Sequence, residues 1–247
     1  MRKFFIMEFK PYREDYKTMN VLSEEAKVVQ TEYISKVYIW MSLALAVTGL
    51  CAHYVANSPS LIHAIITNRI LFFGMIIAEL GLVVYLSARI HTMSFLTAVW
   101  AFLIYSLLNG ATLSVLFMAY TASSIATTFY ITAGTFIVMS IFGYTTKSDL
   151  TSFGRIFMML LIGLIIASVV NLFLHNETMY WIISYVGVAV FVGLIAYDTQ
   201  KIKNYFAQAQ DDEEMFKKVS ILGALTLYLD FVNLFIFLLR FFGARRD

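Results

Sequence analysis

Three acidic side chains lie inside long apolar stretches of the sequence, where ionisable groups are costly. They are Glu79, Asp198 and Asp230. A charged side chain at the centre of a membrane helix costs at least about 2.5–3.5 kcal/mol, so each of these acids needs a reason to be there. A carboxyl group can take up and release a proton, and its oxygens are the ligands that hard cations such as calcium prefer. The chemistry that these residues offer is therefore reversible protonation and cation binding.

Asp230 lies deepest within its apolar stretch, which covers 219–241. It follows the start of that stretch by 11 residues, which is roughly 16 Å of helix and about half of a bilayer core. A lone aspartate at that depth would stay protonated. A second carboxyl group beside it would couple the two titrations, and the pair could then share one proton. A proton and a cation would compete for such a site.

Arg89 and Asp198 end two different apolar stretches on the same side of the predicted membrane. Their depths match, so an ion pair between them is geometrically possible, and it could close a pore when formed and open it when broken. Asp198 is predicted to lie shallower than Asp230, at an interface where charge is cheap. The alternative is that these residues have structural roles. Each acid could be protonated and hydrogen-bonded, and Glu79 could simply join helices. Arg89 could be an anchor whose charged end reaches the membrane surface.

The elements that must position these residues are membrane-spanning helices. Of the 247 residues, 60% are hydrophobic and 14% are charged, and the mean hydropathy is +0.76. A soluble domain has about 45–50% apolar and about 25% charged residues, so soluble, disordered and nucleic-acid-binding proteins are excluded. A spanning helix needs about 20 mostly apolar residues. The sequence therefore predicts an all-α polytopic membrane protein with seven transmembrane helices, at 37–56, 70–88, 95–118, 124–143, 156–174, 179–197 and 219–241.

This reading divides the chain into an N-terminal cytoplasmic tail (1–33), a seven-helix domain (34–243) and a short C-terminal tail (244–247). No cleavable signal peptide is predicted. With the N-terminus inside, 14 of the 18 lysines and arginines lie on the cytoplasmic side, as the positive-inside rule requires. The basic C-terminal tail contradicts this orientation. A re-entrant last segment would place the tail inside, but 219–241 is long enough to cross, and we favour seven full spans.

Several features point away from an enzyme. No lysine lies within 219–241, which excludes a retinal Schiff base in the last helix. The sequence has neither a glycine-rich phosphate loop nor an HExxH zinc-protease motif. The single cysteine, Cys51, excludes a disulfide framework. We therefore expect no catalysis and no cofactor, with calcium at most a permeant or bound ion.

Other polar residues give weaker signals. Asn109, Asn171 and Asn233 lie within predicted spans and are expected to form interhelical hydrogen bonds. The small residues of 109–112 predict close helix packing. The acidic run 211–214 is expected to lie in a solvated loop that could bind cations weakly.

Four segments together resemble a known family, the Bax inhibitor-1 proteins, and specifically its bacterial branch. The resemblance covers residues 30–243 and is specific, because its motifs are long, ordered and spread over five helices. The segments are Glu79-Leu80-Gly81-Leu82 with Ser87-Ala88-Arg89-Ile90; Asn109-Gly110-Ala111-Thr112-Leu113-Ser114; 142–150, FGYTTKSDL; and 196–202, AYDTQKI, paired with 222–235, LGALTLYLDFVNLF.

The resemblance implies a seven-helix fold with the last helix central, in the bacterial inner membrane, and a pH-sensitive calcium leak. It implies that Asp198 and Asp230 form the pH sensor and a tentative calcium site, and that Arg89 is a latch to the aspartate of the sixth helix. Glu79 matches a further acid whose role is less defined. The expected partners are the lipid bilayer, protons and calcium, and no nucleic acid.

Two other functions stay open at this point. One is a non-conducting regulator that binds another membrane protein, since some bacterial members of the family bind a membrane-anchored protease. The other is a proton/calcium antiporter. In the leak hypothesis, both aspartates ionise at high pH and repel each other, which loosens the central helix, and a shared proton at low pH favours closure.

Overall fold

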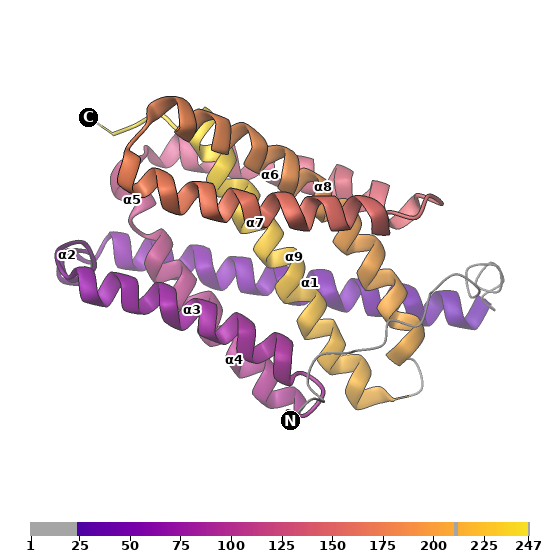
Figure 1. The fold of residues 1–247 in the computed structure, drawn as a ribbon. Coiled ribbons are helices and arrows are strands. Elements are labelled where there is room, and N and C mark those ends of the chain that lie inside the picture. The colour runs from indigo at the N-terminus through magenta and orange to yellow at the C-terminus, as the bar shows by residue number, and fades with distance from the viewer. Residues whose placement is uncertain (1–23, 210–211, 247) are drawn as a thin grey trace, which may run out of the picture.

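The computed structural model describes residues 24–209 and 212–246, and Figure 1 shows them as a bundle of helices. An isolated bridge between Tyr120 and Arg245 is the extended pairing in this part of the chain. The described residues form nine helices: α1 (Glu24–Ala56), α2 (Pro59–Thr67), α3 (Arg69–Arg89), α4 (Phe95–Leu113), α5 (Leu116–Ala119), α6 (Ala122–Thr145), α7 (Thr151–Leu174), α8 (Glu177–Ala209) and α9 (Glu213–Phe242).

Seven helical segments are long and apolar enough to cross a membrane, which confirms the predicted fold class. They are Val28–Ala56, Arg69–Arg89, Phe95–Ala119, Ala122–Thr145, Thr151–Leu174, Glu177–Tyr205 and Glu213–Phe242. The first of them is part of a helix that already begins at Glu24, so that helix runs into the predicted N-terminal tail.

Side-chain caps start four of the helices at defined points. Asn68, Ser94, Thr121 and Asp212 each accept a hydrogen bond from the backbone N–H three residues later. Such a cap satisfies one of the donors that a helix leaves free at its N-terminus. These caps therefore fix the residues at which α3, α4, α6 and α9 begin.

The last helix, α9, is the central one, as predicted. In its most apolar window 67% of the residues are buried, against 6–44% in the other six spans. It packs against α8, α1, α6, α4 and α3, while α7 packs mainly against α8. Small and polar residues suit such a position, because in lipid it is close packing and hydrogen bonding that join helices.

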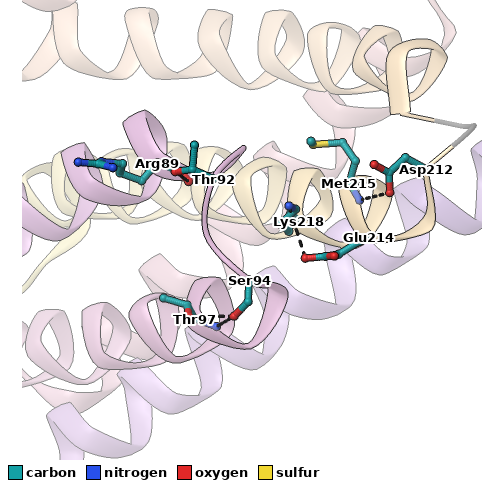
Figure 2. Close-up of polar contacts among 8 residues, drawn as sticks. All are labelled: Arg89, Thr92, Ser94, Thr97, Asp212, Glu214, Met215 and Lys218. Carbon is teal, nitrogen blue, oxygen red and sulfur yellow. Dashed lines mark hydrogen bonds and ion pairs between the residues drawn. The ribbon is translucent and has the colours of Figure 1, made fainter.

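The C-terminal segment shows that α9 crosses the whole bundle. The backbone N–H of Thr121 donates to the carbonyl oxygen of Ala244 at 3.0 Å, and that of Arg246 donates to Ala119 at 3.0 Å. Residues 119–121 join the third span to the fourth, at the end opposite the α3–α4 turn beside which α9 begins (Figures 1 and 2). A re-entrant last segment is therefore wrong. We call the end with the α3–α4 turn the inner end and the other the outer end, following the predicted orientation.

Two glycines allow helices to approach closely beside the polar centre of the bundle. A Cβ atom at Gly110 would lie 2.6 Å from the carbonyl oxygen of Thr48, so α4 and α1 meet there, as the small residues of 109–112 predicted. A Cβ atom at Gly143 would overlap the backbone of Ala196. This second contact joins α6 to α8 two residues before Asp198.

Candidate functional site

Asp198 on α8 and Asp230 on α9 come together inside the bundle. They are only 7% and 5% exposed, and their carboxyl groups lie close enough to interact with each other. Because a carboxylate has no hydrogen to donate, a hydrogen bond between the two groups would require one proton on the pair. The expectation that Asp198 lies shallower is wrong. The apolar stretch ends near residue 197, but α8 continues to Ala209, so Asp198 lies well inside its helix.

One oxygen of the pair has no protein partner. Asp230 Oδ2 is fully buried and accepts no hydrogen bond from the described residues. Three hydroxyl oxygens in the same condition lie on the neighbouring helices: Thr128 and Ser140 on α6, and Thr199 on α8. Buried polar atoms are nearly always paired, so each of these atoms has capacity for a water molecule or a cation.

The cation beside the pair is Lys201, which sequence reasoning did not select. Its Nζ lies 3.9 Å from Asp198 Oδ1, one helical turn further along α8, and its side chain is 40% exposed. The ammonium group also lies 5.7 Å from the ring centres of Tyr197 and Tyr205. The sequence did contain a signal for this contact, because Asp198 and Lys201 are three residues apart and such residues are neighbours on the surface of a helix.

Arg89 does not reach Asp198 in this structure, so the predicted ion pair is absent. Arg89 lies exposed in the last turn of α3 and forms no ion pair with any described residue. In Figure 2 its guanidinium group points away from Lys218. Matching depth did not bring the two residues together because α3 packs on α4 and touches α9, whereas Asp198 lies on α8. The exposed position fits the alternative of an anchor at the membrane surface.

The N-terminus of α9 lies beside the α3–α4 turn and has its own charged groups (Figure 2). Asp212 Oδ1 accepts the backbone N–H of Met215 at 3.0 Å, and the buried Lys218 pairs with Glu214 at 3.5 Å. Residues 212–214 of the acidic run therefore cap and begin a helix and do not form a loop. Acidic groups at a helix N-terminus are favoured by the helix dipole. Asp211 lies outside the described residues.

Glu79 belongs to a separate hydrogen-bonded chain that ties four helices together. Its two oxygens accept from Asn109 Nδ2 at 3.1 Å and from Thr112 Oγ1 at 2.5 Å. The Tyr228 hydroxyl group donates to Asn109 Oδ1 at 2.9 Å and lies 2.7 Å from Thr48 Oγ1. This arrangement matches the structural alternative for Glu79. Since Tyr228 is two residues before Asp230, the chain also fixes α9 close to the acid pair.

Of the three asparagines expected to join helices, only Asn109 does so. Asn171 Oδ1 accepts the backbone N–H of Asn176 in the α7–α8 turn at 3.0 Å. Asn233 donates to the carbonyl oxygen of Leu229 in its own helix at 2.8 Å. Both bonds are local, so a position within a span did not by itself indicate an interhelical partner.

Two side chains of α8 bind the α6–α7 turn and the last turn of α6. Gln200 donates to the carbonyl oxygen of Ser148 at 2.8 Å and accepts the N–H of Leu150 at 2.9 Å. Lys203 Nζ donates to the carbonyl oxygen of Tyr144 at 2.9 Å. These bonds explain why 142–150 and 196–202 occur together as motifs: the turn and the helix that carries Asp198 form one unit.

The pair alone does not complete a calcium shell. Calcium takes six to eight oxygen ligands, and the described residues contain no group of three or more histidine, cysteine, aspartate and glutamate side chains that could hold a metal ion. Two carboxyl groups would need water or backbone oxygens to complete the shell.

Comparison with known proteins matches nearly the whole chain to one family. Residues 30–247 match the family described as inhibitor of apoptosis-promoting Bax1. The inner membrane protein YbhL of Escherichia coli strain K12 is 52% identical over 215 residues, which are 87% of this chain and 92% of YbhL. An uncharacterized protein of Borreliella burgdorferi is 42% identical over 220 residues, 89% of this chain and 95% of its own. The protein RP147 of Rickettsia prowazekii is 46% identical over 217 residues, 87% and 90% of the two chains.

Proposed function

Because the chain belongs to the Bax inhibitor-1 family and is an integral protein of the inner membrane, we propose that it is a passive, proton-gated cation leak that favours calcium. The observation that carries the proposal is the contact between the carboxyl groups of Asp198 and Asp230 inside the bundle. At low pH the pair holds one proton, and its hydrogen bond joins α8 to α9. At higher pH both carboxyl groups ionise and repel, which separates the two helices.

The repulsion has the magnitude that a gate needs. Two like charges 4 Å apart repel by about 4 kcal/mol at an effective dielectric constant of 20. Moving a two-state equilibrium from 1:99 to 99:1 takes about 5.5 kcal/mol. Loss of the shared proton therefore supplies much of the free energy for opening. Lys201 offsets part of this repulsion, because its positive charge lies 3.9 Å from Asp198.

The same change creates a site for a permeant cation. Once ionised, the pair carries two negative charges, and Asp230 Oδ2 already has unused capacity to accept a ligand. Hard cations prefer such oxygen ligands, and a proton competes with them for the same carboxyl groups.

In the described state the charge that acts on Asp198 is that of Lys201 on the same helix, and it favours the ionised pair instead of latching it closed. Arg89 would act as the latch only if the inner end of α3 moved toward α8. The two assignments differ in an observable way, since only the residue that pairs with Asp198 should shift the pH at which flux begins.

Calcium flux into proteoliposomes with an internal calcium dye, stepped from pH 6 to pH 8, tests the proposal. Flux should rise with pH, need no gradient except that of calcium, and lose its pH dependence in Asp198→Asn and Asp230→Asn. Glu32→Gln is the matched control, because it removes an exposed acid that pairs with Lys36 at 2.7 Å. Unchanged pH profiles in both aspartate variants would refute the gating role.

Other outcomes would favour the other two functions. Calcium movement against its own gradient, driven by a proton gradient, would indicate a proton/calcium antiporter. A folded and inserted protein that gives no flux at any pH would indicate a non-conducting regulator. Cross-linking from residues 1–23 in membranes would then search for its partner, with a membrane-anchored protease as the first candidate.

A further inference from the structure

A cavity of about 730 Å³ lies at the outer end of the bundle between α7, α8 and α9, away from the acid pair. One part of its wall is apolar and includes Leu161, Leu164, Ile165, Phe191 and Phe237. The other part is polar, near the helix ends, and includes Asn171, Asn176, Glu177, Tyr180, Arg240 and Arg245. Trp181 also lines the cavity, and tryptophan and tyrosine typically lie at the depth of the lipid headgroups.

Arg240 brings a positive charge to the cavity that no described carboxylate neutralises. Its guanidinium carbon lies 4.9 Å from the ring centre of Tyr180 and 4.8 Å from that of Phe237. One nitrogen donates to Ser184 Oγ at 3.2 Å. Glu177 is the acidic residue of the lining, and it is exposed and forms no ion pair with Arg240 in the described part of the chain. A guanidinium group has five N–H donors, so most of them are free for an anion.

Arg245 is held beside Arg240 by the backbone. It pairs with Tyr120 in the isolated bridge, and the hydrogen bonds of Ala244 and Arg246 on either side fix the segment. Tyr120 does not neutralise the two arginines, since burial, and to a smaller extent Tyr180, raises the pKa of its hydroxyl group and keeps it uncharged. The polar part of the cavity therefore carries two positive charges, and the backbone that bears Arg245 is held in place.

We infer that this cavity binds an anionic phospholipid of the outer leaflet, with the phosphate at Arg240 and Arg245 and an acyl chain along the apolar wall of α7. Planar guanidinium groups match phosphate oxygens with paired, charge-assisted hydrogen bonds. A free phosphate ion would leave the apolar part of the cavity unused, and its volume is in the usual range for sites that enclose larger ligands. The lipid-facing side of α7 supplies the route, because only 6% of its window is buried.

Native mass spectrometry of the full chain in detergent tests the inference without any flux measurement. The probes are phosphatidylglycerol and phosphatidylethanolamine with identical acyl chains, and inorganic phosphate. Phosphatidylglycerol should bind preferentially, and Arg240→Gln should weaken its binding about ten- to a hundredfold, the range of one charge-assisted hydrogen bond. Arg240→Lys should recover part of the loss. Arg155→Gln, which changes an exposed arginine on α7, should bind like the wild type.

Further variants keep the test decisive if Arg240→Gln does not fold. Arg245→Gln should weaken phosphatidylglycerol binding in the same direction, and Ser168→Phe should weaken it by filling the cavity that Ser168 lines. Equal binding of the two lipids to the wild type would overturn the inference. Unchanged phosphatidylglycerol binding in both Arg245→Gln and Ser168→Phe would also overturn it. Binding of inorganic phosphate without displacement of the lipid would overturn it as well.

Discussion

Substitution of Lys201 by glutamine should move the pH at which calcium flux begins to a higher value. Lys201 Nζ lies 3.9 Å from Asp198 Oδ1, and its positive charge favours the ionised form of the acid pair. At that distance the attraction is about 1 kcal/mol in water and about 4 kcal/mol at an effective dielectric constant of 20. The side chain is 40% exposed, so solvent screening places the value near the lower limit.

A loss of about 1 kcal/mol corresponds to roughly 0.7 pH unit. Without Lys201 the pair should keep its shared proton to a higher pH, so the midpoint of the flux profile should rise by about that amount in Lys201→Gln. The proteoliposome assay, sampled in steps of 0.25 pH unit between pH 6 and pH 9, resolves such a shift. Lys201→Arg retains the charge and should leave the midpoint close to that of the wild type.

The decisive comparison is with Arg89→Gln. Arg89 is exposed and has no ion pair in the described residues, so this variant should leave the midpoint unchanged. A shift in Arg89→Gln together with an unchanged midpoint in Lys201→Gln would refute the reasoning. That result would mean that Arg89 pairs with Asp198 in a conformation of the protein other than the one described.

Three further variants test the packing around the pair. Tyr228→Phe should lower stability by about 0.6–2 kcal/mol, because it leaves the buried Asn109 Oδ1 without its donor; thermal unfolding in detergent measures the loss, and Tyr130→Phe, exposed to lipid, should cost nothing. Glu79→Gln should lower the unfolding temperature yet leave the flux midpoint in place, since its hydrogen bonds to Asn109 and Thr112 go to α4 and not to the acid pair; a moved midpoint would contradict the separation of the two clusters. Gly143→Ala should cost about 1–3 kcal/mol by overpacking against the α8 backbone, and an unfolding temperature equal to that of the wild type would show that α6 and α8 are not in close contact.

The spans could be predicted from the sequence, but the contacts between them could not. Seven apolar stretches gave seven helices because every spanning segment must be long and apolar. An apolar stretch ends where the chain leaves the lipid, but the helix can continue beyond that point. That difference misplaced Asp198, whose helix runs on to Ala209. The central position of α9 came from the family resemblance, since apolar residues face both lipid and protein.

Depth along the membrane is only one coordinate of a residue. Arg89 and Asp198 matched in depth, but the direction in which each side chain points and the neighbours of its helix are set by packing. Gly143 and Gly110 determine much of that packing through close approach of backbones, which no hydropathy pattern reports. Lys201 could have been found, because an acid and a base three residues apart on a helix are neighbours.

The hydrogen bonds around the pair indicate which helix is free to move if the pair separates. Sliding α9 along its axis would break the hydrogen bond between Thr121 and Ala244 at the outer end. It would also break the hydrogen bonds of the Tyr228 hydroxyl group in the middle of the bundle. Movement of α8 together with the α6–α7 turn, which Gln200 holds to α8, would keep these bonds and would break the bond of Arg240 to Ser184 at the outer end. The aspartate that moves is then Asp198, and Asp230 stays on the fixed central helix. Lys201 would travel with Asp198, so its positive charge stays beside the ionised group in both states and favours the opened pair.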